Sequence, residues 1–167
     1  MDGRGDDLDV LHDEAGWRVG IWNNLLFTAI SQAPSATSLA HVRRGQRRLL
    51  EMDGPIGGLT LVVGLRLGPL DLTEAMRDEL KQMMNVPNLR GHSAIVIESD
   101  GFAGAAVRAV LGAVILLAHT DSPQKMFESR EAAARYLAAH APGGWNTEQL
   151  LIAAHRFTEG LGRSIGG

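Results

Sequence analysis

The residues of this chain that could do chemistry gather at one turn, in the stretch ESDGFAG that begins at Glu98. A β-branched run ends there, and Ser99, Asp100 and Gly101 lead into an apolar helix that we expect from Phe102 onward. A helix N-terminus presents free N–H groups and the positive end of the helix dipole, so it attracts anions. Such a turn could bind a phosphate, carry one, or hold a nucleophile.

The patterns that usually accompany this chemistry are missing from the turn. The sequence has no G-x-x-x-x-G-K-S/T phosphate loop, no G-x-G-x-x-G motif and no G-x-S-x-G nucleophile elbow. The plainer interpretation is that Ser99 or Asp100 caps the helix and Gly101 permits the sharp bend. Arg108 could lean toward a carboxylate of the turn, or cover apolar surface with its stem. We therefore expect residues 99–102 and Arg108 to contact a partner.

Metal and catalytic sites find little support in the spacing of polar residues. Six histidines are present, but none pairs with another at i,i+4, none lies in H-E-x-x-H, and there is no cysteine. An enzyme would need an acid–base pair drawn from distant residues such as Glu98, Asp100 and His119. The sequence therefore predicts no metal, no cofactor and no catalytic activity.

A second candidate surface is basic, in the stretch HVRRGQRR at residues 41–48. Arg43, Arg44, Arg47 and Arg48 fall on the outer side of a predicted helix, where like charges at i,i+4 repel unless something compensates them. Water, a partner protein, the acidic start of this chain, or nucleic acid could do so. Nucleic acid is the weakest of these alternatives because no aromatic residues interleave with the arginines.

Composition sets the class of protein that must position these residues. The chain has 167 residues, 45% of them hydrophobic and 5% aromatic, with a net charge of −3. An aliphatic core is expected. The absence of cysteine and of a signal peptide favours a cytoplasmic protein. The longest apolar run has about ten residues against roughly 20 for a spanning helix, so no membrane insertion is expected.

Periodicity predicts an α/β fold in which strands and helices alternate. Two strands, at 17–22 and 25–30, flank an Asn-Asn pair that suits a tight hairpin. Apolar runs at 58–66 and 93–97 and a short segment at 125–127 complete a small mixed, mostly parallel sheet. Helices are expected between the strands, with one extra helix at the C-terminal end.

Three segments are predicted along the chain. Residues 1–16 form an acidic leader with six carboxylates in its first fourteen residues, either a flexible solubilising tail or a pseudo-substrate or docking tail. Residues 17–141 form the α/β domain, and residues 142–167 a hinge and an amphipathic helix. That helix either packs back on the sheet or mediates a homodimer, and we favour the homodimer.

The stretch SAIVIESDGFAGAAVRAVLGAVILL, followed by SPQKMFESREAAARYLA, resembles the C-terminal half of STAS-type domains, the fold of the bacterial anti-sigma-factor antagonists. It is more similar still to a loosely characterised bacterial group of STAS-like proteins. In that group an apolar helix, an F-x-S strand and an E-A-A-x-x-L helix close the domain, as Phe127, Ser129, Glu131 and Leu137 would here. The resemblance covers roughly residues 17–140 and implies a small mixed sheet that lacks catalytic apparatus.

The same resemblance implies a role for the turn. The better-known members bind a kinase-like anti-sigma factor and are switched off when a serine in Asp-Ser-Ser/Thr-Gly is phosphorylated. Ser99 would be the phosphoacceptor here, although Asp100 replaces the second hydroxyl residue and could instead make the turn permanently anionic.

Three functions remain open from the sequence. The first is a non-catalytic regulatory or scaffolding module that binds an unknown protein partner. The second is a small-molecule or lipid carrier with a layout like that of the CRAL-TRIO proteins. The third is an enzyme whose site is assembled from distant residues.

Overall fold

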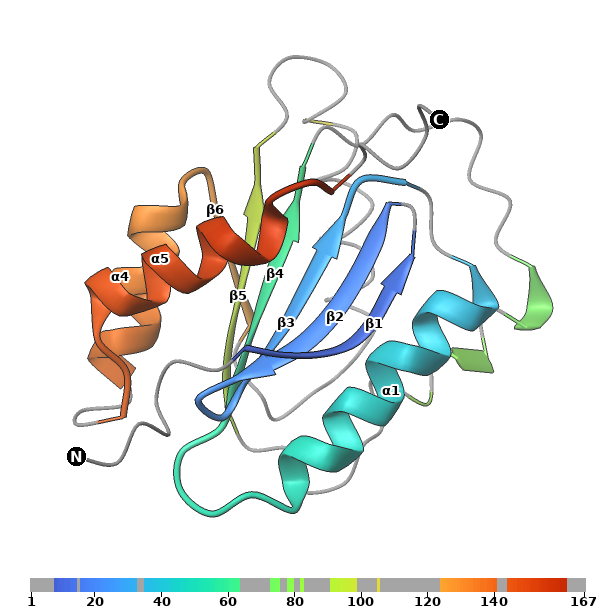
Figure 1. Ribbon diagram of the computed structural model, residues 1–167, viewed down its shortest axis with the longest axis horizontal. Coiled ribbons are helices and arrows are strands. Elements are labelled where there is room, and N and C mark those ends of the chain that lie inside the picture. Colours follow the sequence, from blue (N-terminus) through green and yellow to red (C-terminus); the bar gives the residue numbers. More distant parts are fainter. Residues whose placement is uncertain are drawn as a thin grey trace.

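The structure is a computed structural model in which one twisted sheet separates two layers of helix (Figure 1). It describes residues 8–14, 16–32, 35–63, 73–75, 78–79, 82, 91–98, 105, 124–140 and 144–161. The strands of the sheet, in spatial as well as sequence order, are β1 (Asp9–Glu14), β2 (Trp17–Trp22), β3 (Leu25–Ile30), β4 (Gly57–Val62), β5 (His92–Ile97) and β6 (Gln124–Phe127).

Strands β2 and β3 form the antiparallel hairpin that the sequence predicts. Trp22 pairs with Leu25, so the turn consists of Asn23 and Asn24 alone, and both have positive φ, 48° and 65°. Asparagine tolerates this left-handed backbone better than most residues, which is why an Asn-Asn pair closes a two-residue turn.

From β3 onward the strands are parallel, as expected for strands joined by crossovers. Each new strand lies beside the previous one, so the sheet grows in a single direction. The α/β class and the mixed sheet with its N-terminal hairpin are therefore confirmed. The helices expected over 71–84 and 102–118 fall largely outside the described residues.

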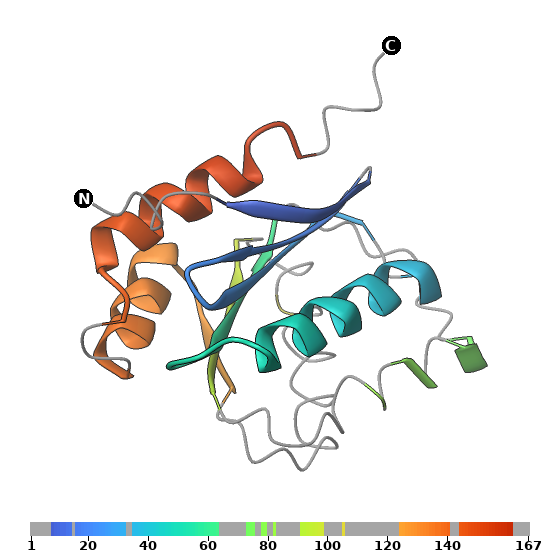
Figure 2. The same ribbon diagram turned by 60° about the horizontal axis from the view of Figure 1, so that its bottom comes forward.

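The two faces of the sheet carry separate cores because side chains alternate along each strand. On one face, Val19, Ile21 and Leu26 pack against helix α1 (Ala36–Leu50). On the other, Leu25 and Phe27 pack with residues of helices α4 (Arg130–His140) and α5 (Thr147–Thr158). Figure 2 shows α1 on one side of the sheet and α4 with α5 on the other.

The N-terminal leader is not wholly a flexible tail, and this part of the prediction is wrong. Residues Asp9–Glu14 form β1, the edge strand, which pairs antiparallel with β2 and contains an irregularity between Val10 and His12. Its neighbour Leu8 and its own Leu11 pack against the two cores. Charged side chains are typical of an edge strand, because they discourage pairing with another chain.

Helix α5 takes the first of its two predicted roles and packs back on the sheet. Leu150, Ala154 and Phe157 are buried, and the Phe157 ring lies 5.4 Å from the Phe27 ring in an edge-to-face contact. The favoured homodimer therefore loses the apolar stripe on which it was predicted, since this stripe is covered by the chain itself.

Both ends of α5 are fixed to the hairpin strands. The Trp145 indole N–H, two residues before the helix, donates to the Asn23 carbonyl oxygen at 2.7 Å. At the other end, the Arg18 guanidinium donates to the carbonyl oxygens of Phe157 and of Glu159, the latter at 2.9 Å. A cation at these carbonyls also complements the helix dipole.

Candidate functional site

The predicted turn at Ser99, Asp100, Gly101 and Phe102, together with Arg108, lies outside the described residues. The strand that leads into it is described and ends at Ile97, where Glu98 follows. The role predicted for the turn therefore stays a prediction.

Glu98 itself is committed to the fold. Both of its carboxylate oxygens accept from the Arg130 guanidinium, one of these contacts measuring 3.2 Å, and another Arg130 nitrogen donates to the Thr158 hydroxyl at 2.9 Å. The Arg130 and Glu98 side chains are only 21% and 29% exposed. The Glu98 side chain is thus part of an ion pair that links the end of β5 to the start of α4 and to the end of α5.

Helix α1 presents the basic surface, and its sequence explains which side faces outward. It begins with a reciprocal capping box between Ser35 and Ser38. Leu39, Val42, Gly45 and Leu49 are buried against the sheet. Gly45 allows the close approach, since a Cβ there would meet the Leu26 side chain at 2.5 Å. Arg43 is partly buried and Arg44, Arg47 and Arg48 are exposed, and we call these four residues the arginine face.

Two residues of the arginine face already bind carboxylates of this chain. The Arg43 guanidinium contacts both carboxylate oxygens of Glu79, at 2.9 and 3.3 Å, with both side chains about one-fifth exposed at 22% and 18%. Arg48 lies 2.7 Å from the Asp9 carboxylate of β1, and both side chains are half exposed. Intramolecular compensation, one of the alternatives predicted for these charges, thus applies to Arg43 and Arg48.

The other two arginines of the arginine face differ from Arg43 and Arg48 in their lack of an ion pair within the described residues. Arg44 and Arg47 are exposed, and among the residues that the structure describes neither forms an ion pair. They lie three residues apart, so both point to the same side of the helix. With respect to the described part of the chain, the arginine face therefore keeps two guanidinium groups available to a carboxylate or phosphate.

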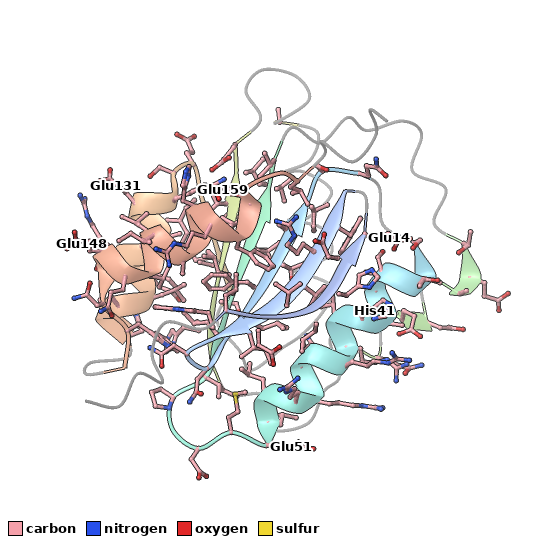
Figure 3. All side chains as sticks on the ribbon, in the orientation of Figure 1. Glu14, His41, Glu51, Glu131, Glu148 and Glu159 are labelled. Carbon is pink, nitrogen blue, oxygen red and sulfur yellow. The ribbon has the colours of Figure 1, made fainter. Side chains whose placement is uncertain are left out.

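Next to this face, His12 of β1 and His41 of α1 form a stacked pair, which we call the histidine stack. Their ring centroids are 3.7 Å apart and the rings are 10° from parallel. His12 Nε2 lies 3.1 Å from a Glu14 carboxylate oxygen. Burial, then His12 and then Arg44 lower the pKa of His41 below its ordinary value of 6.5, while Glu14 acts in the opposite direction. Glu14 and His41 are labelled in Figure 3.

A second histidine cluster lies on the other face of the sheet, where β5 begins and α4 ends. The His140 ring lies 4.3 Å from His92 and 4.4 Å from Tyr136, and its Nδ1–H donates to the Tyr136 carbonyl at 2.7 Å. Lys125 Nζ lies 5.6 Å from the Tyr136 and Phe127 ring centroids. Burial, and secondarily His140, lower the pKa of His92, and burial raises that of Tyr136.

Sequence reasoning missed both clusters. Tyr136 and His140 have the i,i+4 spacing of neighbours on a helix, and this is the only local signal. His92 joins them, and His12 joins His41, through strand and helix packing that no sequence spacing announces. Within the described ranges, no group of three or more histidine, aspartate or glutamate side chains is arranged to hold a metal.

Comparison with known proteins adds no family. The chain matches no protein-family model and has no significant match among curated proteins. Of the helices within the described residues, none combines the length and the apolar character that crossing a membrane requires. The resemblance to STAS-type domains stays a prediction, and the arginine face is the best-formed candidate site.

Proposed function

We propose that the chain is a non-catalytic regulatory or scaffolding module that binds an acidic segment of another protein through the arginine face. The observation that supports this most directly is the pairing of Arg43 with Glu79 and of Arg48 with Asp9. These pairs are examples, within the chain itself, of how α1 holds carboxylates. Arg44 and Arg47 extend the same surface and could receive carboxylates from elsewhere.

A protein partner fits this surface better than nucleic acid does. Helix α1 has no Phe, Tyr or Trp on which a base could stack, its His41 ring is already stacked on His12, and the chain as a whole carries a net charge of −3. A net negative charge opposes long-range attraction of a polyanion such as DNA. A short acidic protein segment needs only the local positive field of the helix.

The layout of the sheet is also compatible with the proposal. The one-directional order of β3 to β6 is what a series of identical crossovers produces, and a small mixed sheet of this kind is what the resemblance to STAS-type domains implies. Glu98, one of the residues from which an enzyme site was to be assembled, is engaged by Arg130 in the fold. The proposal of a binding module is consistent with both points.

The proposal is tested by affinity purification from a bacterial lysate with the wild type and the charge-reversed variant Arg44→Glu/Arg47→Glu. The matched control is Arg135→Glu/Arg156→Glu, because these arginines are also exposed but lie on α4 and α5, across the sheet. We expect a protein with an acidic stretch to bind the wild type and the control, and to be reduced at least about tenfold with the reversed variant.

Direct titration then checks the partner found in this way. Its affinity for the wild type should fall between about 50 and about 300 mM NaCl, since exposed ion pairs are screened by salt. The proposal fails if no recovered protein depends on Arg44 and Arg47, or if a short DNA duplex binds the wild type more tightly than any recovered protein does.

A further inference from the structure

Strand β1 is held to the rest of the chain by charged and titratable side chains more than by apolar ones. As an edge strand it pairs only with β2. Its side chains add the Asp9–Arg48 ion pair at 2.7 Å, the histidine stack, and the Asp13–Arg18 ion pair at 3.1 Å. The backbone ladder is also interrupted between Val10 and His12, directly before the stacked ring. The strand is therefore the element of the sheet most easily detached by a change in charge.

We propose that β1 competes with an acidic partner for the arginine face. The histidine stack holds β1 in place, which we call the latched state, and β1 is released when both stacked histidines carry a proton. In the latched state, Asp9 occupies Arg48, and the carboxylates of β1 lie beside the helix to which an acidic partner would bind. In the released state, Arg48 joins Arg44 and Arg47 as a free guanidinium. The competitor role rests on the proposed function, whereas the latch does not.

The geometry of the stack explains why the latch needs a neutral ring. Two nearly parallel imidazoles 3.7 Å apart pack well when at least one is neutral, but two cations at this distance repel strongly. Glu14, 3.1 Å from His12, can balance one positive charge on the pair. A second proton has no such compensation, because α1 contributes Arg44 to the surroundings of His41.

The other neighbours of the stack do not change this balance. On β2, the residue that pairs with His12 is Val19, which is apolar and fully buried. Arg18, the next residue on β2, is occupied by Asp13 and by the C-terminal carbonyls of α5. On α1, Arg43 is paired with Glu79. Among the residues that the structure describes, the charges left to act on the two rings are therefore those of Glu14 and Arg44.

The direction of the pH effect follows from this arrangement. The pKa of His41 is lowered in the latched state, whereas the detached strand leaves His41 with a pKa nearer its ordinary value of 6.5. The released form therefore takes up more protons as the pH falls through this region, and acid favours release. Above this region of pH His41 is neutral, so the stack does not carry two protons and β1 stays paired.

The latch is tested by amide hydrogen exchange of residues 9–14, with β3 as internal standard, at about pH 7.5 and about pH 5.5 after correction for intrinsic exchange. We expect the protection of β1 in the wild type to fall at least about tenfold at the lower pH, while β3 is unchanged. His41→Gln removes the second charge and should abolish this dependence. His155→Gln, an exposed histidine 76% accessible on α5, is the matched control and should behave as the wild type.

Two outcomes would overturn the latch. One is equal protection of β1 at both pH values in the wild type, and the other is a full loss of protection at acid pH in His41→Gln. If glutamine itself detaches β1 at neutral pH, His12→Gln replaces it, because that variant also prevents double protonation of the stack. A pH-dependent loss in that variant overturns the latch equally.

The competitor role is tested separately by fluorescence anisotropy with a labelled peptide that copies residues 8–14, LDVLHDE, with the change His12→Gln, so that the peptide itself cannot place a second proton beside His41. Release of β1 should raise the affinity of wild-type protein for this peptide at least about fivefold at about pH 5.5, and Arg44→Glu/Arg47→Glu should abolish the gain. Release without tighter binding overturns the competitor role while the latch stands. The affinity purification at neutral pH decides the proposed function independently of either result.

Discussion

On the α4 and α5 side of the sheet, arginine acts as a structural anchor, whereas on the α1 side it is presented to solvent. Arg18 and Arg130 are 14% and 21% exposed, and they end on backbone carbonyls, a hydroxyl and carboxylates that belong to the fold. Arg48 is 51% exposed and has a single half-exposed partner. Arg43, 22% exposed and bound to Glu79, resembles these anchors, so within the described residues the solvent-facing arginines of α1 are Arg44, Arg47 and Arg48.

The apolar cores on the two sides of the sheet also differ, in their content of aromatic residues. The core under α4 and α5 contains aromatic residues from both layers, including Trp22, Phe27, Trp145 and Phe157. Counted over the described residues, the core under α1 is smaller, and Trp17 is its one aromatic member. Aromatic side chains bury the most area, so the first side should contribute more to the free energy of unfolding.

Phe157→Ala is expected to have the largest effect, because it empties the centre of the better-packed side. Phe157 is 1% exposed and its ring contacts Phe27. The loss should be about 3–4 kcal/mol in the free energy of unfolding, measured by urea denaturation. Ile152→Ala on the same helix, 47% exposed, is the control and should change stability by less than about 1 kcal/mol. Equal losses in the two variants would contradict the burial of α5.

Arg130→Met should have the next largest effect. The methionine keeps an apolar stem but leaves Glu98 and the Thr158 hydroxyl without their guanidinium. Because both charged side chains are partly exposed, we expect a loss of about 1–2 kcal/mol in urea denaturation. Arg135→Met, at an exposed position of α4, should leave stability within about 0.5 kcal/mol of the wild type. An Arg130 variant as stable as this control would show that the anchor is dispensable.

Acid should weaken the fold through both histidine clusters, and by less than the loss of Arg130. Folding lowers the pKa values of His41 and His92 below 6.5, so the unfolded chain binds more protons as the pH falls through that value. The free energy of unfolding should therefore decline between about pH 7.5 and about pH 5.5. His41→Gln/His92→Gln should flatten this decline in urea denaturation series, whereas His155→Gln should not. A steeper decline in the double variant would reverse the sign and exclude the mechanism.

Arg44→Glu/Arg47→Glu should have the smallest effect on stability, within about 0.5 kcal/mol, because exposed charges without a fixed partner contribute little. Thermal unfolding of the reversed variant checks this. A large destabilisation would mean that the arginine face is structural after all, and the contrast between the two sides of the sheet would disappear.

Local signals in the sequence account for what could be predicted. The Asn23–Asn24 turn and the apolar runs of β4 and β5 each depend on neighbouring residues, and each forms as expected. The edge strand β1 was missed because three of its six residues are carboxylates. This negative charge led to the prediction of a tail, although the segment also contains the apolar residues Val10 and Leu11. Its stability as a strand depends on Arg18 and Arg48, which only the folded sheet brings near.

The arginine face likewise could be predicted only as far as local sequence signals reach. The four arginines of α1 could be identified from spacing, because i,i+4 neighbours on a helix share a side. Which of them are already neutralised could not be predicted, since Glu79 and Asp9 reach them from other elements. The homodimer was favoured over docking of α5 on the sheet for a similar reason, because an amphipathic stripe specifies an apolar partner but not which chain supplies it.

The contact of Arg18 with the end of α5 has a consequence for how the protein is made. Residue 18 leaves the ribosome long before residues 157 and 159, whose carbonyls it binds. The α1 side of the sheet can close early from nearby segments, but the opposite side must wait, with Trp22 and Phe27 uncovered, until synthesis reaches the last helix. Non-local closure of this kind slows folding, so nascent chains should need protection from aggregation during that interval.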